Sequence, residues 1–128
     1  KELLAVAAQN GVGTIGVRVL AGGALSGSAT RHPLGMPTVA PIGSNTDYAT
    51  DVGRALAFPT LVSAGYAPEL PELAIRYAVS NPDLSTAEIG IATLEELQRA
   101  ADAVNKGPLP DEVLEEIKQI QNGFVATA

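Results

Sequence analysis

The chain has 128 residues, no cysteine and a net charge of −6, which together exclude disulfides, thiolate metal sites and nonspecific binding to polyphosphate backbones. Apolar residues make up 46% of the sequence and aromatic residues only 4%, which suits a core of small side chains and not a nucleic-acid reader. No apolar run approaches the roughly 18 residues of a membrane span, and the start is too short and acidic for a signal peptide, so we expect one cytoplasmic domain over residues 1–128.

The first residues predict a helix that ends at Gln9–Gly11, where glycine suits the left-handed C-terminal position. The apolar residues of this helix that lie on one face are Leu3, Leu4, Ala7 and Ala8. A chain that opens inside a helix, without an N-cap, is expected to be a piece of something longer.

Residues 11–16 match the pattern G-x-G-x-x-G letter for letter. A dinucleotide-binding fingerprint follows a strand and opens a helix, whereas this one follows a helix and leads into the β-branched stretch Thr14–Leu20. We therefore reject the fingerprint and predict a strand over Thr14–Leu20. The small-residue loop Ala21–Gly27 is then either a flexible turn or a close approach of the backbone to a ligand.

Residues 28–50 show no periodicity, and a loop of this length in a compact domain is usually functional or mobile. His32, the only histidine, has no acidic or thiol neighbour in the sequence, which favours a solvated imidazole over a catalytic one. A helix is predicted over Asp51–Ser63. A second helix follows, with Pro71 in its first turn and Tyr77 expected in the core, on the stripe Leu70, Leu73, Ala74, Tyr77 and Ala78.

The stretch Ser80–Val104 changes its hydrophobic period in the middle. After a breaker at Asn81–Asp83, Ser85–Ala92 reads as a short strand, and a period of 3.6 begins at Thr93, which forms a T-x-x-E capping box with Glu96. The expected inward face of this helix is Leu94, Leu97, Ala101 and Val104. A strand that ends in a capped helix is where α/β proteins bind phosphates and nucleotides.

The last predicted helix runs over Asp111–Gln121 and is expected to end at Asn122–Gly123. Its glutamates read as ordinary surface, and its inward face is Val113, Leu114, Ile117 and Ile120. Strands that alternate with helices indicate right-handed βαβ units and a parallel sheet. Two strands cannot enclose a core, so the chain reads as about a third of a fold.

Three segments together resemble the C-terminal part of an aldo-keto reductase, in the aldose and galactose dehydrogenase-like branch. They are Gly11–Gly27, similar to the family's seventh strand and its loop, Leu73–Pro82, and Ile89–Leu97, similar to the family's cofactor motif. The resemblance implies the C-terminal portion of a (β/α)8 TIM barrel, with two parallel strands, their helices and a C-terminal helix. It further implies NADP or NAD as cofactor and a carbonyl or sugar substrate, while the catalytic Asp-Tyr-Lys-His set of the family lies outside the matching part.

Carried over by position, the resemblance implies three groups of cofactor contacts. Those toward the pyrophosphate are Arg18, Leu20 and Gly22; those at the adenosine phosphate are Gly90, Ile91 and Ala92; and those at the adenine ribose and ring are Glu96, Arg99 and Ala100. A barrel's phosphate site is indeed built by the loops after strands seven and eight. The family often has Asn at position 100 and Gln or a basic residue at position 96, so Ala100 and Glu96 weaken the case for NADP over NAD.

Three interpretations remain open at this level. The first is an oxidoreductase piece that binds cofactor but is inactive alone, because Tyr48, Tyr66 and Tyr77 do not lie in a catalytic context. The second is the end of a phosphate-binding barrel enzyme of the aldolase or isomerase type. The third is a non-catalytic half-barrel that acts by association through its open strand edges. No metal, membrane or nucleic-acid partner is expected.

Overall fold

The computed structural model describes residues 2–28, 30, 32–35, 40 and 44–125. In chain order these residues form α1 (Glu2–Gln9), β1 (Ile15–Gly16), the 3-10 helix η1 (Ala21–Ser26), α2 (Tyr48–Ala55), α3 (Pro59–Ser63), α4 (Leu70–Val79), β2 (Thr86–Ala87), α5 (Leu94–Asn105) and α6 (Asp111–Val125). The strands pair in parallel, with Ile15 opposite Thr86 and Gly16 opposite Ala87. The predicted α/β class with a parallel strand pair is therefore confirmed.

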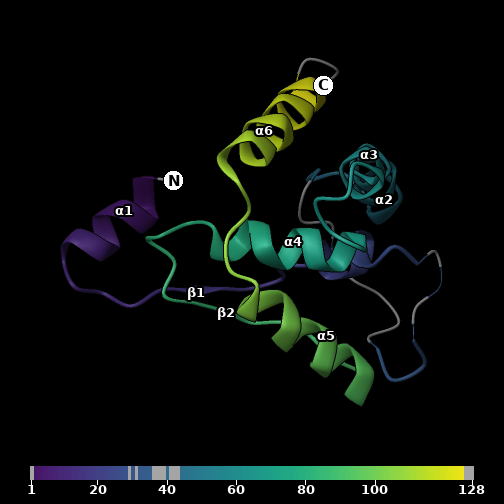
Figure 1. The fold of residues 1–128 in the computed structure, drawn as a ribbon, viewed down its shortest axis with the longest axis horizontal. Coiled ribbons are helices and arrows are strands. Elements are labelled where there is room, and N and C mark those ends of the chain that lie inside the picture. Colours follow the sequence, from purple (N-terminus) through teal and green to yellow (C-terminus); the bar gives the residue numbers. More distant parts are fainter. Residues whose placement is uncertain (1, 29, 31, 36–39, 41–43, 126–128) are drawn as a thin grey trace.

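Helix α1 stands apart at one end of the molecule, and α2 and α3 lie together at the other (Figure 1). Helix α1 ends where the sequence predicts, because Gly11 takes the left-handed conformation at φ 69°. The G-x-G-x-x-G segment follows this helix and ends in β1, so it does not open a helix, in agreement with its rejection as a fingerprint. No residue of α1 is buried.

Both strands are shorter than predicted. The ladder holds two residues of each strand, extended by hydrogen bonds from Thr86 N to Thr14 O (3.1 Å) and from Glu88 N to Gly16 O (2.8 Å). Beyond β1 the chain leaves the extended conformation at Arg18, whose φ is +59°. A β-branched sequence therefore predicted the strand, but the ladder extends only as far as the backbone stays extended beside its neighbour.

Two clusters of buried apolar side chains form the core, and α4 contributes to both. The first consists of Leu61, Ala67, Leu73, Leu109, Val113 and Ile117. The second consists of Ile75, Ala100 and Ala103, with Val19, Leu20 and Ile89 packed against it. Leu73 and Ile75 lie two positions apart on α4, so this helix joins the C-terminal helix on one side to the strand layer on the other.

The faces that two helices turn inward differ from those predicted. Tyr77 is 37% exposed and not in the core, while Ile75, outside the predicted stripe, is buried. On α5 the predicted inward face is wrong, since Leu94 is 81% exposed. The buried positions are Ala100 and Ala103, because small side chains let α5 approach α4 closely.

The remaining helices match their predictions in part. The helix predicted over Asp51–Ser63 is two helices, and Pro59 begins the second, α3. Helix α6 has Val113 and Ile117 buried as predicted, but it runs past Asn122–Gly123 to Val125. Its last turn is held by packing, since Phe124 meets the ring of Phe58 edge-on at 6.0 Å between centroids.

One arginine ties the α3–α4 and α5–α6 connections to α4. Arg76 donates to the carbonyl oxygens of Tyr66 (Nη1, 3.1 Å), Gly107 (Nε, 3.1 Å) and Pro108 (Nη2, 3.0 Å). Ser80 Oγ accepts from Leu109 N at 2.9 Å. These bonds satisfy backbone groups that no helix or strand pairs, and they fix where α6 begins.

Candidate functional site

The candidate site lies where the two strands end. Because β1 and β2 are parallel, their carboxyl ends meet at one edge of the sheet, which is where ligands bind in α/β proteins. The chain continues from β1 into η1 and from β2 into the N-terminus of α5. Figure 1 shows α5 starting directly beyond β2.

After β1 the backbone turns sharply through a run of left-handed residues. Arg18 is exposed and is followed by Ala21, Gly22 and Gly23 with φ values of 50°, 66° and 105°. Gly23 N closes the turn by donating to Leu20 O at 2.8 Å. Of the three residues predicted to face the pyrophosphate, Arg18 is thus open to solvent, while Leu20 and Gly22 are half-buried within the turn.

After β2 the chain enters α5 through the predicted capping box. Gly90 and Ile91 are exposed, and Ala92 is half-buried. Thr93 Oγ1 accepts from Glu96 N at 3.1 Å, while Glu96 Oε2 accepts from Ala92 N at 2.7 Å and from Thr93 N at 3.2 Å. The capping box is therefore confirmed, and Glu96 is part of it.

The last two predicted contact residues, Arg99 and Ala100, are an ion-paired surface side chain and a buried one. Arg99 pairs with Glu69 (3.1 Å) and with Glu95 (2.5 Å), and the hydrogen bond that it donates to Glu95, together with the negative charge of both carboxylates, raises the pKa of Arg99. Ala100 is buried in the second core cluster. Of the three residues predicted to meet the adenine ribose and ring, Glu96 is the one that lines a hollow.

The hollow that Glu96 lines has a volume of about 450 Å³ and lies between η1, α2 and α5. It is lined by Gly23, Ser26, Ser28, Thr30, His32, Pro33, Gly35, Tyr48 and Glu96. His32 is exposed, as predicted, and its Nδ1 accepts from Leu34 N at 3.1 Å. Sequence reasoning missed the hydroxyl groups here, although the run of Ser and Thr directly after the glycine turn was a visible signal.

A larger groove of about 830 Å³ lies on the other side, at the start of the strands. It is lined by residues of α1, β1, the end of α4, the α4–β2 connection and α6, such as Leu4, Asn81 and Leu114. The described residues therefore form two open concavities, one beyond the strands and one that β1 itself helps to line.

Within the described ranges, no three His, Asp or Glu side chains are placed to share a metal ion. None of the helices that the structure describes has the length and apolar character to cross a bilayer.

In a comparison with family models, residues 1–122 match the model described as the aldo/keto reductase family. The chain belongs to the aldo/keto reductase family. Comparison with curated proteins and with solved structures gave no significant match. Membership implies a TIM barrel and, in general, NAD(P)H as cofactor. The parallel strands and their helices are consistent with part of this aldo-keto reductase barrel.

Proposed function

We propose that this chain forms the cofactor-binding end of an NAD(P)-dependent aldo-keto reductase that interconverts carbonyls and alcohols. The observation that carries the proposal is the hollow at the carboxyl ends of β1 and β2, lined by residues of both η1 and α5. Its serine, threonine and tyrosine hydroxyls are suited to the many polar groups of a dinucleotide. The family match favours this interpretation over an aldolase or isomerase barrel.

In this proposal each segment around the hollow contacts a different part of the cofactor. The turn after β1, with Arg18, Leu20 and Gly22, faces the pyrophosphate, and the segment Gly90–Ala92 faces the adenosine phosphate. Glu96 meets the adenine ribose, while Arg99 and Ala100 act behind it as supports, since one is ion-paired and the other is buried.

No residue of the chain is assigned to catalysis. Proton donation in the intact enzyme requires a tyrosine supported by lysine and aspartate, and we propose that this set lies outside the 128 residues. Purified chain mixed with NADPH and a simple aldehyde is expected to show no turnover. Measurable turnover would contradict this assignment.

Cofactor binding is tested by calorimetric titration of NAD⁺, NADP⁺ and fructose 1,6-bisphosphate into the purified chain. A nicotinamide cofactor is expected to bind more tightly than the sugar phosphate, and the reverse preference would contradict the reductase proposal. Gly22→Ala should weaken the binding, because Gly22 holds a φ of 66° beside the hollow. Gly65→Ala is the matched control, since Gly65 has a φ of 87° in the α3–α4 connection.

A second candidate function is association with another polypeptide through the sheet. Ile15 in β1 and Val17 directly after it are 66% and 63% exposed, so the strand pair leaves large apolar side chains open. In a closed barrel such side chains are covered by the interior side chains of other strands. Sedimentation over a range of concentrations tests this candidate.

A further inference from the structure

The tripeptide Gln-Asn-Gly occurs twice in the chain, in two different backbone conformations. At residues 9–11 it ends α1 and enters a turn, where Gly11 is left-handed with a φ of 69°. At residues 121–123 it lies inside α6, which continues to Val125. In both copies the asparagine and the glycine are exposed to solvent. The two copies therefore share their local sequence and differ in how the backbone is held.

An asparagine that precedes a glycine is open to an intramolecular reaction of its side-chain amide. Because glycine has no Cβ, its backbone nitrogen can approach the asparagine Cγ with little steric hindrance. In the first copy the Gly11 nitrogen loses its proton to a base and attacks Asn10 Cγ. The new N–Cγ bond forms, the Cγ–Nδ2 bond breaks, and ammonia leaves with a proton from solvent. Water then opens the five-membered imide at one carbonyl to give aspartate, or at the other to give isoaspartate.

The first copy is held by two hydrogen bonds that both belong to the last turn of α1. Asn10 Nδ2 donates to Val6 O at 2.8 Å, and Gly11 N donates to Ala8 O at 3.0 Å. Helix α1 has no buried residue and stands apart from the other helices (Figure 1). Opening this turn therefore disrupts little packing, and local fraying of α1 frees both groups for the reaction.

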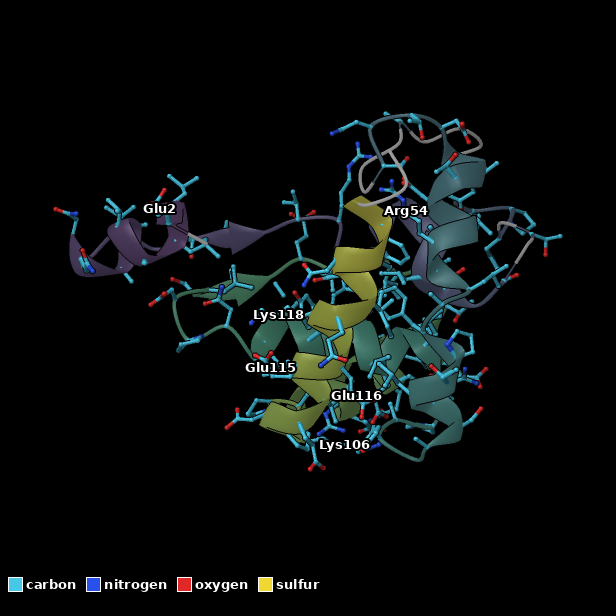
Figure 2. The ribbon with its side chains drawn as sticks, turned by 90° about the horizontal axis from the view of Figure 1, so that it is seen from above. Glu2, Arg54, Lys106, Glu115, Glu116 and Lys118 are labelled. Carbon is cyan, nitrogen blue, oxygen red and sulfur yellow. The ribbon has the colours of Figure 1, made fainter. Side chains whose placement is uncertain are left out.

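The second copy is held by tertiary contacts of the residue that follows it. Phe124 meets the ring of Phe58 edge-on at 6.0 Å between centroids. The guanidinium of Arg54 lies 5.4 Å from the centroid of the Phe124 ring, and Figure 2 shows Arg54 beside the end of α6. Reaction at Asn122 requires this turn of α6 to open and Phe124 to leave both partners.

We propose that Asn10 is a site of spontaneous deamidation and that this modification loosens α1. The product carries a carboxylate, which cannot donate to Val6 O. It also places a negative charge at the C-terminal end of the helix, where the helix dipole is itself negative. The proposal is independent of the proposed cofactor function, because no described residue of α1 lines the hollow.

The first test incubates the purified chain in mildly alkaline buffer and measures aspartate and isoaspartate at both positions by peptide mapping with mass spectrometry. In the folded chain we expect Asn10 to react about tenfold or more faster than Asn122. In denaturing urea, where the structure no longer distinguishes the copies, we expect the two rates to agree within about threefold. A rate ratio that is the same in folded and denatured chain would overturn the proposal. Absence of product at Asn10 in the folded chain, when the denatured chain reacts, would overturn it as well.

The effect on α1 is tested with Asn10→Asp, which carries the charge of the modified chain from the start. The probe is hydrogen exchange of Val12 N–H, which donates to Ala7 O at 2.9 Å across the end of α1. We expect its protection to fall by about threefold or more in N10D. The matched control is Asn122→Asp, which adds the same charge at an exposed position of α6 and should leave this amide unchanged. Unchanged protection in N10D, or an equal fall in N122D, would overturn the claim that the modification loosens α1.

Discussion

Thr93 fixes the position of the corner where β2 passes into α5. Its side chain accepts a hydrogen bond from the N–H of Glu96, and the Glu96 carboxylate accepts from the N–H groups of Ala92 and Thr93, just before the first turn. The pair therefore sets both the start of the helix and the charge at the edge of the hollow. The side chains of Thr93 and Glu96 therefore affect both the stability of α5 and the charge that a ligand in the hollow would meet.

Replacing Thr93 with alanine is expected to lower the free energy of unfolding by about 1 kcal/mol, because the amide of Glu96 loses its acceptor. Urea denaturation followed by circular dichroism measures the change. Thr93→Ser keeps the hydroxyl and should unfold within about 0.5 kcal/mol of the wild type. If T93A and T93S had the same free energy of unfolding, the capping hydrogen bond would not contribute to stability.

Helix α4 is the element on which both core clusters depend. Leu73 belongs to the cluster with α3 and α6, and Ile75 to the cluster with α5 and the strands. Arg76, one position on, holds the connections that lead to α4 and away from α5. A substitution in this helix is therefore expected to affect the packing of both core clusters.

Leu73→Ala should lower the free energy of unfolding by about 2–5 kcal/mol, since Leu73 is 2% exposed and its truncation leaves a cavity. The matched control is Leu94→Ala on α5, which removes the same atoms from a side chain in solvent and should change stability by less than about 0.5 kcal/mol. Chemical denaturation of both variants measures the difference. Equal losses would mean that the exposed face of α5 is covered in solution.

The helices were predictable from sequence because their period and caps are local signals. Helix α4, the capping box of α5 and the inward face of α6 all followed from spacing alone. The inward face of α5 did not, because the helix carries leucines on one side and alanines on the next, and only the approach of α4 decides between them. Strand length likewise depends on a neighbouring strand, which composition does not reveal.

At the scale of the whole molecule, the sheet is the least complete part. In the portion of the chain that the structure describes, β1 and β2 pair only with each other, so each strand keeps an open edge. Some residues of the candidate site can be found from a local sequence motif, whereas others are brought to it only by the fold. Glu96 could be found from its capping motif, whereas Tyr48 comes to the hollow from α2, far from the strands in sequence.

If the exposed apolar side chains of the strand pair bind other chains, the wild type should sediment above its monomer mass as its concentration rises. Ile15→Lys places a charge among them and should weaken the association by about tenfold or more. Leu34→Lys is the control, because Leu34 is 78% exposed in the loop after η1 and away from the sheet. A wild type that stays monomeric at every concentration would rule out this use of the surface.

The central claim, that the carboxyl ends of β1 and β2 form a nicotinamide cofactor site, is tested most directly by an amide NMR spectrum recorded during titration with NAD⁺. We expect signals of Gly22 and of Gly90–Ala92 to shift together with those of the hollow, such as Ser26, because these residues surround one ligand. Shifts gathered instead around Asn81 and Leu84, in the groove that β1 helps to line, would contradict the claim, as would an unchanged spectrum at saturating NAD⁺.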